Sequence, residues 1–395
     1  MPTRREPRIF FDLSTTLRWS GPPVGILRVE GELARWGREH LRDFKPVFFD
    51  PLTQRHCEAD DRSAERFLCG DAVLDTIGMT DAARPRKRKT DRVPAAIKPL
   101  AMWVLQFRRK LLQTLERLRL TSASTRRAAL IDRVQRLIMS PKYRAIMVKE
   151  DGTRRAFVPP GMIVGRPVAF APGDILLCAG AGWAHTNIAA IRAEKERSGL
   201  RLALLCYDII PIIFPQFYKP HDVAMFRDYY DVAFPTSDLV IVTSRSVEAD
   251  VRKHCGDHDL ALAQTAVVPL GSDIIRVPAE LTMELPAGLE PGRYALLVST
   301  IEPRKGHRLL YNVWRKLLDE GVPQKTGFKL VFVGRPGWMV EDLMRDLTGD
   351  SRLAGSLHVL ERVDDRTMVA LYRGAAFCCY PSAYEGYGLP IVESF

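Results

Sequence analysis

The sequence predicts an α/β protein with two doubly wound, parallel-sheet domains. Short apolar runs alternate with helical patterns along most of the 395 residues, and several runs end in small or polar residues. A chain of this length accommodates two domains of ordinary size. The proline-rich stretch 276–292 is expected to be a linker, with one domain at 1–275 and the other at 293–395.

Composition favours well-packed cores, because 46% of the residues are apolar and 9% are aromatic. No apolar run approaches the roughly 20 residues that span a bilayer. Met1–Pro7 leads straight into a strand, so no secretory signal is expected. The seven cysteines are scattered without metal-type spacing, which fits a reducing compartment. We expect a cytoplasmic protein, soluble or peripheral on the inner face of the cytoplasmic membrane.

The first domain is expected to begin with a strand at Arg8–Leu13, a polar loop at Ser14–Gly25 and a helix at Ile26–His40. The helix has its apolar residues at helical spacing: Ile26, Val29, Leu33 and Trp36. A glycine-containing loop between a first strand and a first helix is where doubly wound sheets bind ligands. An ordinary connection explains these residues as well.

The later strands of this domain end in small or polar residues, as ligand sites in parallel sheets require. A helix is expected at Ser246–His254, capped by Ser244 or Ser246. The expected strands are Pro46–Asp50, Asp174–Cys178, Leu202–Tyr207, Leu239–Val242 and Ala266–Val268.

Residues 81–145 form a basic insertion with predicted helical structure. Between Arg84 and Arg144 there are 18 Lys or Arg and three acidic residues, so the net charge of +11 arises here and the remainder is slightly acidic. From Lys98 to Leu120 one apolar helical stripe has basic flanks. Such a helix suits an anionic lipid surface or docking on its own domain. A nucleic-acid partner is not expected, because aromatic interleaving and a binding motif are missing.

The second domain is expected to start with a strand at Tyr294–Ser299 and a helix from about Lys305 to Asp319. Arg304 and Lys305 stand at the start of that helix, where the helix dipole disfavours cations. A bound anion would explain them; pairing with Glu302 or plain solvation is the alternative. Further strands are expected at Lys329–Val333 and Leu357–Leu360, with a helix ending at about Gly374.

The last stretch, Tyr380–Phe395, reads YPSAYEGYGLPIVESF. A buried strand at Ala375–Tyr380 is expected to lead through a glycine turn into a helix with Pro390 in its first turn. Glu385 and Glu393 lie eight positions apart. Glycine-exposed amides favour an anion such as a diphosphate, and a carboxylate can accept hydrogen bonds from sugar hydroxyls. A plain helix cap is the alternative.

This stretch resembles the E-x7-E signature of the retaining glycosyltransferases of family 4, which have the GT-B fold. The I-E-P-R-K-G run at 301–306 resembles the phosphate-binding motif of that family. GILRVEGEL at 25–33, YDIIPIIFPQFY at 207–218 and VVPLGSD at 267–273 resemble further family segments. The resemblance covers Arg8–Asp50 and Asp174–Phe395, and leaves out 81–145.

The resemblance implies two Rossmann-like domains that face a cleft. It also implies transfer of a sugar from a GDP- or UDP-sugar to a glycan or lipid-linked glycan, with retention of configuration. We favour a mannose-type hexose and a role in cell-surface polysaccharide biosynthesis. No cofactor or metal is expected, because cations already occupy the phosphate site and no Asp-x-Asp pair is placed to hold one.

The resemblance also implies roles for individual residues. Glu385 would contact the transferred sugar and Glu393 the ribose. Tyr207 stands where many relatives have histidine, and a tyrosine is a poor proton acceptor near neutrality. The catalytic candidates are Glu385, Asp208 and Tyr207. The donor-binding candidates are Arg304, Lys305, Gly334, Val363, Gly386, Tyr387, Gly388, Leu389 and Glu393, and the acceptor- or phosphate-side candidates are Gly25 and Arg28.

Relatives continue beyond the position of Phe395, so we expect the sequence as given to be truncated at its C-terminus. Two rival functions remain open at this point. One is a non-catalytic, membrane-associated scaffold, and the other is a nucleic-acid-binding protein that uses residues 84–144.

Overall fold

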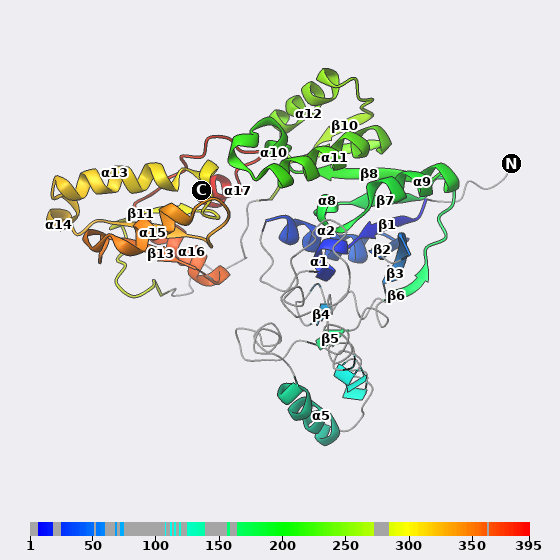
Figure 1. Cartoon of the computed structure of the whole chain (residues 1–395), viewed down its shortest axis with the longest axis horizontal. Helices are drawn as coiled ribbons and strands as arrows, with labels where there is room; N and C mark the ends of the chain where they lie inside the picture. Colours follow the sequence, from blue (N-terminus) through cyan, green and yellow to red (C-terminus); the bar gives the residue numbers. More distant parts are fainter. Residues whose placement is uncertain are drawn as a thin grey trace, which may run out of the picture. The chain divides into compact units, whose positions relative to one another are not determined.

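The computed structural model describes residues 7–18, 25–50, 53–59, 164–271, 284–361 and 363–395, together with short pieces between 68 and 158 (Figure 1). The described residues form one sheet of eight strands, one of four and one of two. The two larger sheets are mainly parallel and carry helices between their strands, so the predicted α/β class is confirmed.

The eight-stranded sheet has the strand order β10-β9-β8-β7-β1-β2-β3-β6. Its centre is parallel, because β1 pairs in parallel with β2 and β7, and β7 with β8. β3 pairs antiparallel with β2 and β6, which the sequence did not predict. The strands are β1 (Ile9–Asp12), β2 (Phe44–Asp50), β3 (Arg55–Ala59), β6 (Val164–Pro167), β7 (Ile175–Cys178), β8 (Arg201–Cys206), β9 (Leu239–Val242) and β10 (Gln264–Val267).

The two helices predicted here are present as α2 and α12, whereas α8, α9, α10 and α11 were not predicted, and α1 (Ser14–Arg18) was predicted as loop. The Asp12 carboxylate accepts a hydrogen bond from the Ser14 amide at 2.9 Å, and Leu17 is buried, so a helical turn is stabilised. The others are α2 (Ile26–His40), α8 (Gly182–His185), α9 (Ile188–Ser198), α10 (Ile210–Ile213), η2 (Pro215–Phe217), α11 (Pro220–Thr236) and α12 (Arg245–Asp257). Ser244 caps α12.

The buried face of α2 does not coincide with its apolar stripe. Leu33 and Trp36 are exposed, whereas the buried residues are Leu27, Glu30, Gly31, Ala34 and Gly37. A Cβ on Gly37 would lie 2.3 Å from the ring of Phe44, so small residues let α2 approach the sheet closely. The apolar spacing therefore predicted the helix correctly but does not mark the side that packs on the sheet.

The four-stranded sheet has the order β13-β12-β11-β14 with parallel pairing throughout. Its strands are β11 (Tyr294–Val298), β12 (Lys329–Val333), β13 (Leu357–Leu360) and β14 (Phe377–Cys378). Its helices are η3 (Pro303–Lys305), α13 (His307–Asp319), α14 (Val322–Thr326), α15 (Glu341–Gly349), η4 (Ser351–Leu353), α16 (Asp365–Gly374) and α17 (Leu389–Glu393). The predicted buried strand Ala375–Tyr380 is a two-residue, exposed strand, because β14 is an edge strand paired only with β11.

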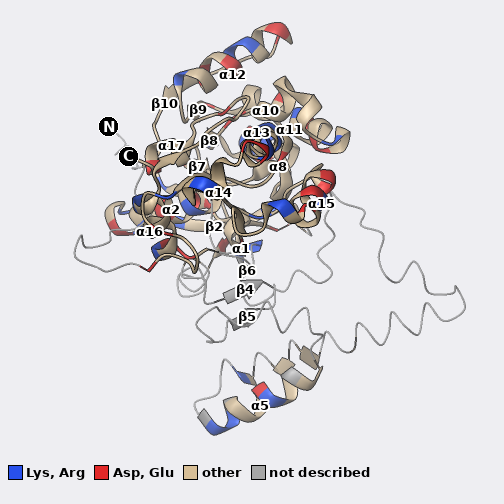
Figure 2. Ribbon diagram, turned by 90° about the vertical axis from the view of Figure 1, so that its left-hand side faces the viewer, with Lys and Arg blue, Asp and Glu red and all other residues tan. Residues whose placement is uncertain are grey.

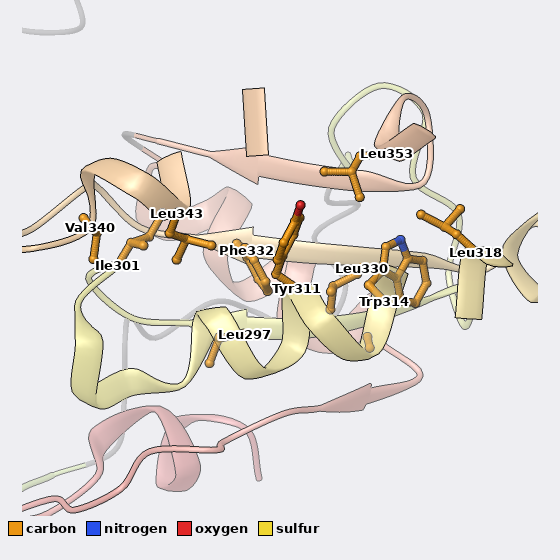
Figure 3. Packing of buried hydrophobic residues seen from close by; sticks show 11 residues of the cluster. Leu297, Ile301, Tyr311, Trp314, Leu318, Leu330, Phe332, Val340, Leu343 and Leu353 are labelled. Carbon is orange, nitrogen blue, oxygen red and sulfur yellow. The ribbon is translucent and has the colours of Figure 1, made fainter. Parts of the chain in front are cut away.

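The sheet has a hydrophobic core on each face. On one face Leu297 and Phe332 pack with Tyr311 and Trp314 of α13 and Leu343 of α15 (Figure 3). On the opposite face the buried residues include Tyr294, Leu296, Val331 and Leu371, the last from α16. Alternate residues of β11 and β12 therefore point to opposite helical layers, as a doubly wound sheet requires.

The chain divides into two compact units. The first unit holds Met1–Leu205, Tyr229–Ile241 and Leu260–Gln264, and the second holds Cys206–Asp228, Val242–Asp259 and Thr265–Phe395. The second unit thus includes the segments that follow β8 and β9. The predicted domain boundaries stay predictions, and 276–283 of the predicted linker lie outside the described residues.

Most of the predicted insertion 81–145 lies outside the described residues, including most of Lys98–Leu120. The helix α5 (Thr125–Ile138) lies in this insertion, which was predicted to be helical without these bounds, and it carries mainly basic charge (Figure 2). Two short strands, β4 (Ala72–Leu74) and β5 (Ala156–Val158), pair in parallel. Among the helices described, none is both long and apolar enough to cross a bilayer.

Candidate functional site

The second unit gathers several predicted site residues around η3. Gly306 follows η3 with φ of 78°, a conformation that favours glycine, and α13 begins only at His307. The helix therefore starts two residues later than predicted, and Arg304 and Lys305 lie in the turn before it. A Cβ on Gly306 would lie 2.5 Å from the carbonyl oxygen of Pro381. Glycine at 306 thus allows the turn at 380–388 to pack against η3.

Arg304 is buried and is held by acidic and carbonyl oxygens. Its Nη2 donates to Glu302 Oε1 at 2.8 Å, and its Nη1 lies 2.8 Å from Glu385 Oε2. Nη1 also donates to the carbonyl oxygen of Tyr384. Burial alone would lower the pKa of Arg304, but Glu385 and the other acidic neighbours raise it above its ordinary value. Arg304 therefore does pair with Glu302, as one of the alternatives expected, while its role toward an anion stays a prediction.

Lys305 binds the other oxygen of the same carboxylate. Its Nζ lies 2.5 Å from Glu385 Oε1, and both side chains are largely buried. Glu385 thus holds one cation with each oxygen. Burial tends to raise the pKa of Glu385, but Lys305 and Arg304 outweigh it and place this pKa below its ordinary value. The carboxylate is charged and fixed in place.

Two further carboxyl groups face this cluster. Burial raises the pKa of Glu302 despite its contact with Arg304. Burial also raises the pKa of Asp208, although Arg304 and Lys305 oppose the shift. Three carboxyl groups and two cations therefore share one small volume, and an added anion would have to compete with Glu385 for Lys305 and Arg304.

The glycine turn after Glu385 packs closely on the segment that follows β8. A Cβ on Gly386 would lie 2.5 Å from the carbonyl oxygen of Tyr207 and 2.9 Å from Asp208 Cβ. Ser244 Oγ donates to the Gly386 carbonyl at 2.6 Å, and Tyr387 donates through its hydroxyl to the Leu270 carbonyl at 2.7 Å. Gly388 has φ of 84°, and Leu389 opens α17. Glycine is therefore favoured at 386 by close packing and at 388 by the backbone angle.

Of the two candidates after β8, Asp208 lies beside the cation cluster. Its Oδ1 accepts a hydrogen bond from the Ile210 amide at 3.0 Å, so it also acts as a local cap. Tyr207 is buried, and its carbonyl oxygen accepts from Thr243 Oγ1 at 3.1 Å. The structure therefore brings Asp208, Arg304, Lys305, Glu385 and Gly386 together.

The remaining donor-side candidates lie in the same unit but outside the two turns that carry Arg304, Lys305 and Glu385. Glu393 in α17 accepts a hydrogen bond from the Tyr372 hydroxyl at 3.2 Å. Val363 precedes α16 and packs against the core that contains Leu371. Gly334 follows β12, and a Cβ there would lie 1.9 Å from the carbonyl oxygen of Ser299, so no other residue fits without a shift.

Several buried polar atoms near this cluster have no hydrogen-bond partner within ordinary geometry. They are Ser299 Oγ, Arg304 Nε and both ring nitrogens of His307. The side chains of Tyr380 and Ser382 interact with Glu385. Buried polar atoms usually have a hydrogen-bond partner, so Ser299 and His307 are candidate contacts for a polar ligand. None of Ser299, His307, Tyr380 and Ser382 was predicted as a site residue; their positions beside the IEPRKG run and Glu385 were the available signal.

The acceptor-side candidates Gly25 and Arg28 lie in the first unit, at the start of α2. Gly25 has φ of 54°, and a Cβ there would meet nothing within 4 Å. Its carbonyl oxygen accepts from the Arg28 amide at 3.0 Å. Glycine is thus favoured at position 25 by the backbone angle that the N-cap of α2 adopts. The acceptor-side role of Gly25 and Arg28 stays a prediction.

A buried polar cluster that the sequence did not predict lies at the ends of β1 and β7 in the first unit. Glu30 is fully buried; its Oε2 accepts from the amide and hydroxyl of Thr16, while its Oε1 has no partner. Burial and the neighbouring Asp12 raise the pKa of Glu30 well above its ordinary value. His56 Nε2 lies 3.8 Å from Asp12 Oδ2.

Within the described part of the chain, no group of three His, Cys, Asp or Glu side chains is placed to hold a metal ion. The expected metal-free chemistry stays a prediction.

The geometry of the second unit can be compared with known proteins. Residues 287–395 match the family model of glycosyl transferases group 1. The matched segment contains Arg304, Lys305 and Glu385, and it supports the predicted enzyme class of glycosyltransferase.

Two kinds of relatives have similar sequences. The serotype-specific mannosyltransferase WbdA of Escherichia coli is 26% identical over 246 residues, which cover 58% of this chain and 29% of WbdA. The O-antigen chain mannosyltransferase B of Escherichia coli is 36% identical over 101 residues, 26% of each chain. The chain thus spans less than a third of the length of either relative.

Solved structures show a partial likeness. HepE from Anabaena, in complex with UDP and glucose, is 19% identical with a TM-score of 0.40, over 56% of each chain. Trehalose-6-phosphate synthase OtsA in its apo form is 14% identical with a TM-score of 0.42, over 56% of this chain and 55% of OtsA. The fold assignment rests on the two parallel sheets described above.

Proposed function

We propose that this chain is a glycosyltransferase that moves a sugar from a nucleotide-sugar donor to a glycan or lipid-linked glycan, with retention of configuration. The observation that carries the proposal is the contact of Lys305 and Arg304 with one carboxylate, Glu385, inside the segment that matches the glycosyl transferase family. Two cations can bind the diphosphate of a nucleotide-sugar, and a carboxylate beside them can accept hydrogen bonds from its sugar.

In this proposal the donor diphosphate takes Lys305 and Arg304 as counter-ions. Charge develops on the leaving diphosphate as the glycosidic bond breaks, and fixed cations stabilise it without reorganising. The amides of Gly386–Gly388 add hydrogen-bond donors. Glu385 is then free to accept hydrogen bonds from the transferred sugar, and Glu393 from the ribose. Val363 and Gly334 line the nucleotide side.

Asp208 and Tyr207 are assigned to the reacting side of the site. Asp208 lies against Gly386, and burial raises its pKa, which favours a carboxyl group that can donate a proton. Tyr207 can donate a hydrogen bond through its hydroxyl. Gly25 and Arg28 are assigned to the acceptor or phosphate side, on the resemblance of 25–33 alone. The reaction proceeds without a metal, since lysine and arginine supply the positive charge.

The donor is proposed to carry mannose, because the similar relatives are mannosyltransferases named for serotype and O-antigen chains. The same names favour a growing surface polysaccharide as the acceptor. Both GDP and UDP remain candidate carriers. We also propose a cytoplasmic location at the inner face of the membrane, with residues 98–120 as one predicted contact.

The test is a donor screen on the chain. Thermal unfolding is followed with GDP, UDP and their hexose conjugates, and release of nucleoside diphosphate is measured with mannan-type acceptors. A rise in Tm with one nucleotide series, together with acceptor-dependent release, supports transfer. Stabilisation without release under any condition would favour a scaffold that binds the donor only. No stabilisation by any nucleotide would remove the proposal.

A further inference from the structure

The helix α5 presents an outer face on which apolar and basic residues alternate. Leu130, Val134 and Leu137 follow the i, i+4, i+7 spacing of a single helix face, and they are 64%, 38% and 85% exposed. Arg126 and Arg133 precede Leu130 and Leu137 by four residues each and are also exposed. A helix face that binds nothing rarely carries several leucines with so much of their side chains exposed to solvent.

The opposite face of α5 is the packed one. Gln135 is fully buried and donates through its Nε2 to the carbonyl oxygen of Leu112 at 3.5 Å. Leu112 is itself buried. Since Gln135 lies across the helix from Leu130 and Leu137, the exposed leucines do not belong to the side that holds α5 against its own chain.

The basic residues around this face favour an anionic partner. α5 carries four arginines and one acidic residue, and it lies in the segment 84–144, where 18 basic residues meet three acidic ones. No ion pair of Arg126 or Arg133 occurs within the described residues. Phe107 and Leu118 add exposed apolar surface in the same segment. A face that offers both leucine and unneutralised arginine matches the boundary between anionic headgroups and acyl chains.

We propose that the outer face of α5 docks the protein on an anionic lipid surface. Leu130 and Leu137 enter the headgroup boundary while Arg126 and Arg133 contact lipid phosphates. This docking is independent of the proposed sugar transfer, because it uses none of the residues of the second unit. It assigns the lipid contact to a helix outside the 98–120 segment predicted from the sequence.

The test is co-sedimentation of the full chain with vesicles of phosphatidylcholine mixed with phosphatidylglycerol, and with vesicles of phosphatidylcholine alone. We expect binding to the anionic vesicles that weakens with salt. The variant Arg126→Gln/Arg133→Gln should bind about 30-fold more weakly, since each arginine near such a surface contributes roughly a fivefold factor. Leu130→Ser/Leu137→Ser should weaken binding at every salt concentration.

The matched control is Arg201→Gln/Arg227→Gln, which removes the same charge from exposed positions on β8 and α11. It should bind vesicles like the unchanged protein, and circular dichroism checks that all variants are folded. The proposal would be overturned if the unchanged protein bound both vesicle types equally. It would also be overturned if the control lost as much affinity as the arginine variant, or if both α5 variants bound like the unchanged protein. The proposal would also be overturned if light scattering showed that Leu130 and Leu137 hold two copies of the protein together. It would be overturned likewise if the protein bound duplex DNA more tightly than anionic vesicles and the arginine variant lost that binding.

Discussion

Lys305 and Glu385 form an ion pair of 2.5 Å that joins the turn before α13 to the turn after β14. The same carboxylate binds Arg304 at 2.8 Å through its other oxygen. In the protein without a ligand, the two cations proposed for the donor diphosphate are therefore neutralised by the residue proposed for the donor sugar. Under the proposed function, a donor diphosphate that binds Lys305 and Arg304 must displace the Glu385 carboxylate from them.

This coupling predicts an unusual effect of Glu385→Gln on binding. The change removes the competing charge, so GDP or UDP alone should bind several-fold more tightly than to the unchanged protein. A nucleotide-sugar should lose its advantage over the free nucleotide, because the carboxylate no longer accepts from the sugar. Isothermal titration with nucleotide and nucleotide-sugar measures both. Weaker binding of the free nucleotide by the variant would contradict the coupling.

Substitutions of Glu385 and Glu393 should change different kinetic parameters. Glu393→Gln should raise KM more than it lowers kcat, since the ribose does not react and its contacts are shared by ground and transition states. Glu385→Gln should lower kcat, because contacts to the reacting sugar tighten in the transition state. Tyr372→Phe removes the hydrogen bond to Glu393 and should show a milder KM effect. Steady-state kinetics with full kcat/KM in both glutamate variants would contradict these roles.

Glu30 should make the first unit less stable as pH rises. Its folded pKa is raised, so the folded state holds a proton that the unfolded chain releases above about pH 4.3. The stability from Glu30 is complete below that pH and is lost as pH rises through the folded pKa. Glu30→Gln, a neutral isostere, should therefore gain stability over the unchanged protein between pH 5 and 8. Urea unfolding measures it, and the exposed Glu32→Gln is the control.

His307 should act with the opposite sign. Burial lowers its pKa to about 4, and Lys305 adds to the shift. The unfolded histidine takes up a proton near pH 6.5, so stability falls as pH drops from about 6.5 toward 4, by at most about 3 kcal/mol. His307→Leu should flatten this dependence, whereas His221→Leu at an exposed position of α11 should not. Equal slopes in both variants would show that His307 does not titrate in this range.

The sequence predicted strands well wherever apolar runs were short and bounded, as at Lys329–Val333, which matches β12 residue for residue. It failed where burial depends on neighbours distant in sequence. Leu33 and Trp36 belong to the apolar stripe that predicted the helix, yet α2 buries Gly31, Ala34 and Gly37, because small residues let a helix pack closely on a sheet. Periodicity alone does not reveal this preference.

The sequence predicted which residues form the candidate site but not how they contact one another. The IEPRKG run and Glu385 lie on the two turns that the structure brings together, and their role stays a prediction. That Glu385 binds both Arg304 and Lys305 could not be read from residues 80 positions apart. Glu30 was also missed, since a glutamate in an otherwise amphipathic helix is expected to be exposed.

The most direct test of the account is nucleotide binding by Lys305→Ala. Lys305 is preferred to Arg304, because removing Arg304 would leave Glu302 buried without its ion-pair partner, whereas Glu385 keeps Arg304 when Lys305 is removed. Titration calorimetry with GDP and UDP should show binding of one nucleotide to the unchanged chain. Loss of one charge-assisted hydrogen bond, about 1.5–3 kcal/mol, should weaken it roughly 10- to 100-fold. Lys316→Ala, at an exposed position of α13, should leave the affinity unchanged. Equal affinity in Lys305→Ala and the unchanged chain, or no binding of either nucleotide, would contradict the assignment of this site to a nucleotide-sugar.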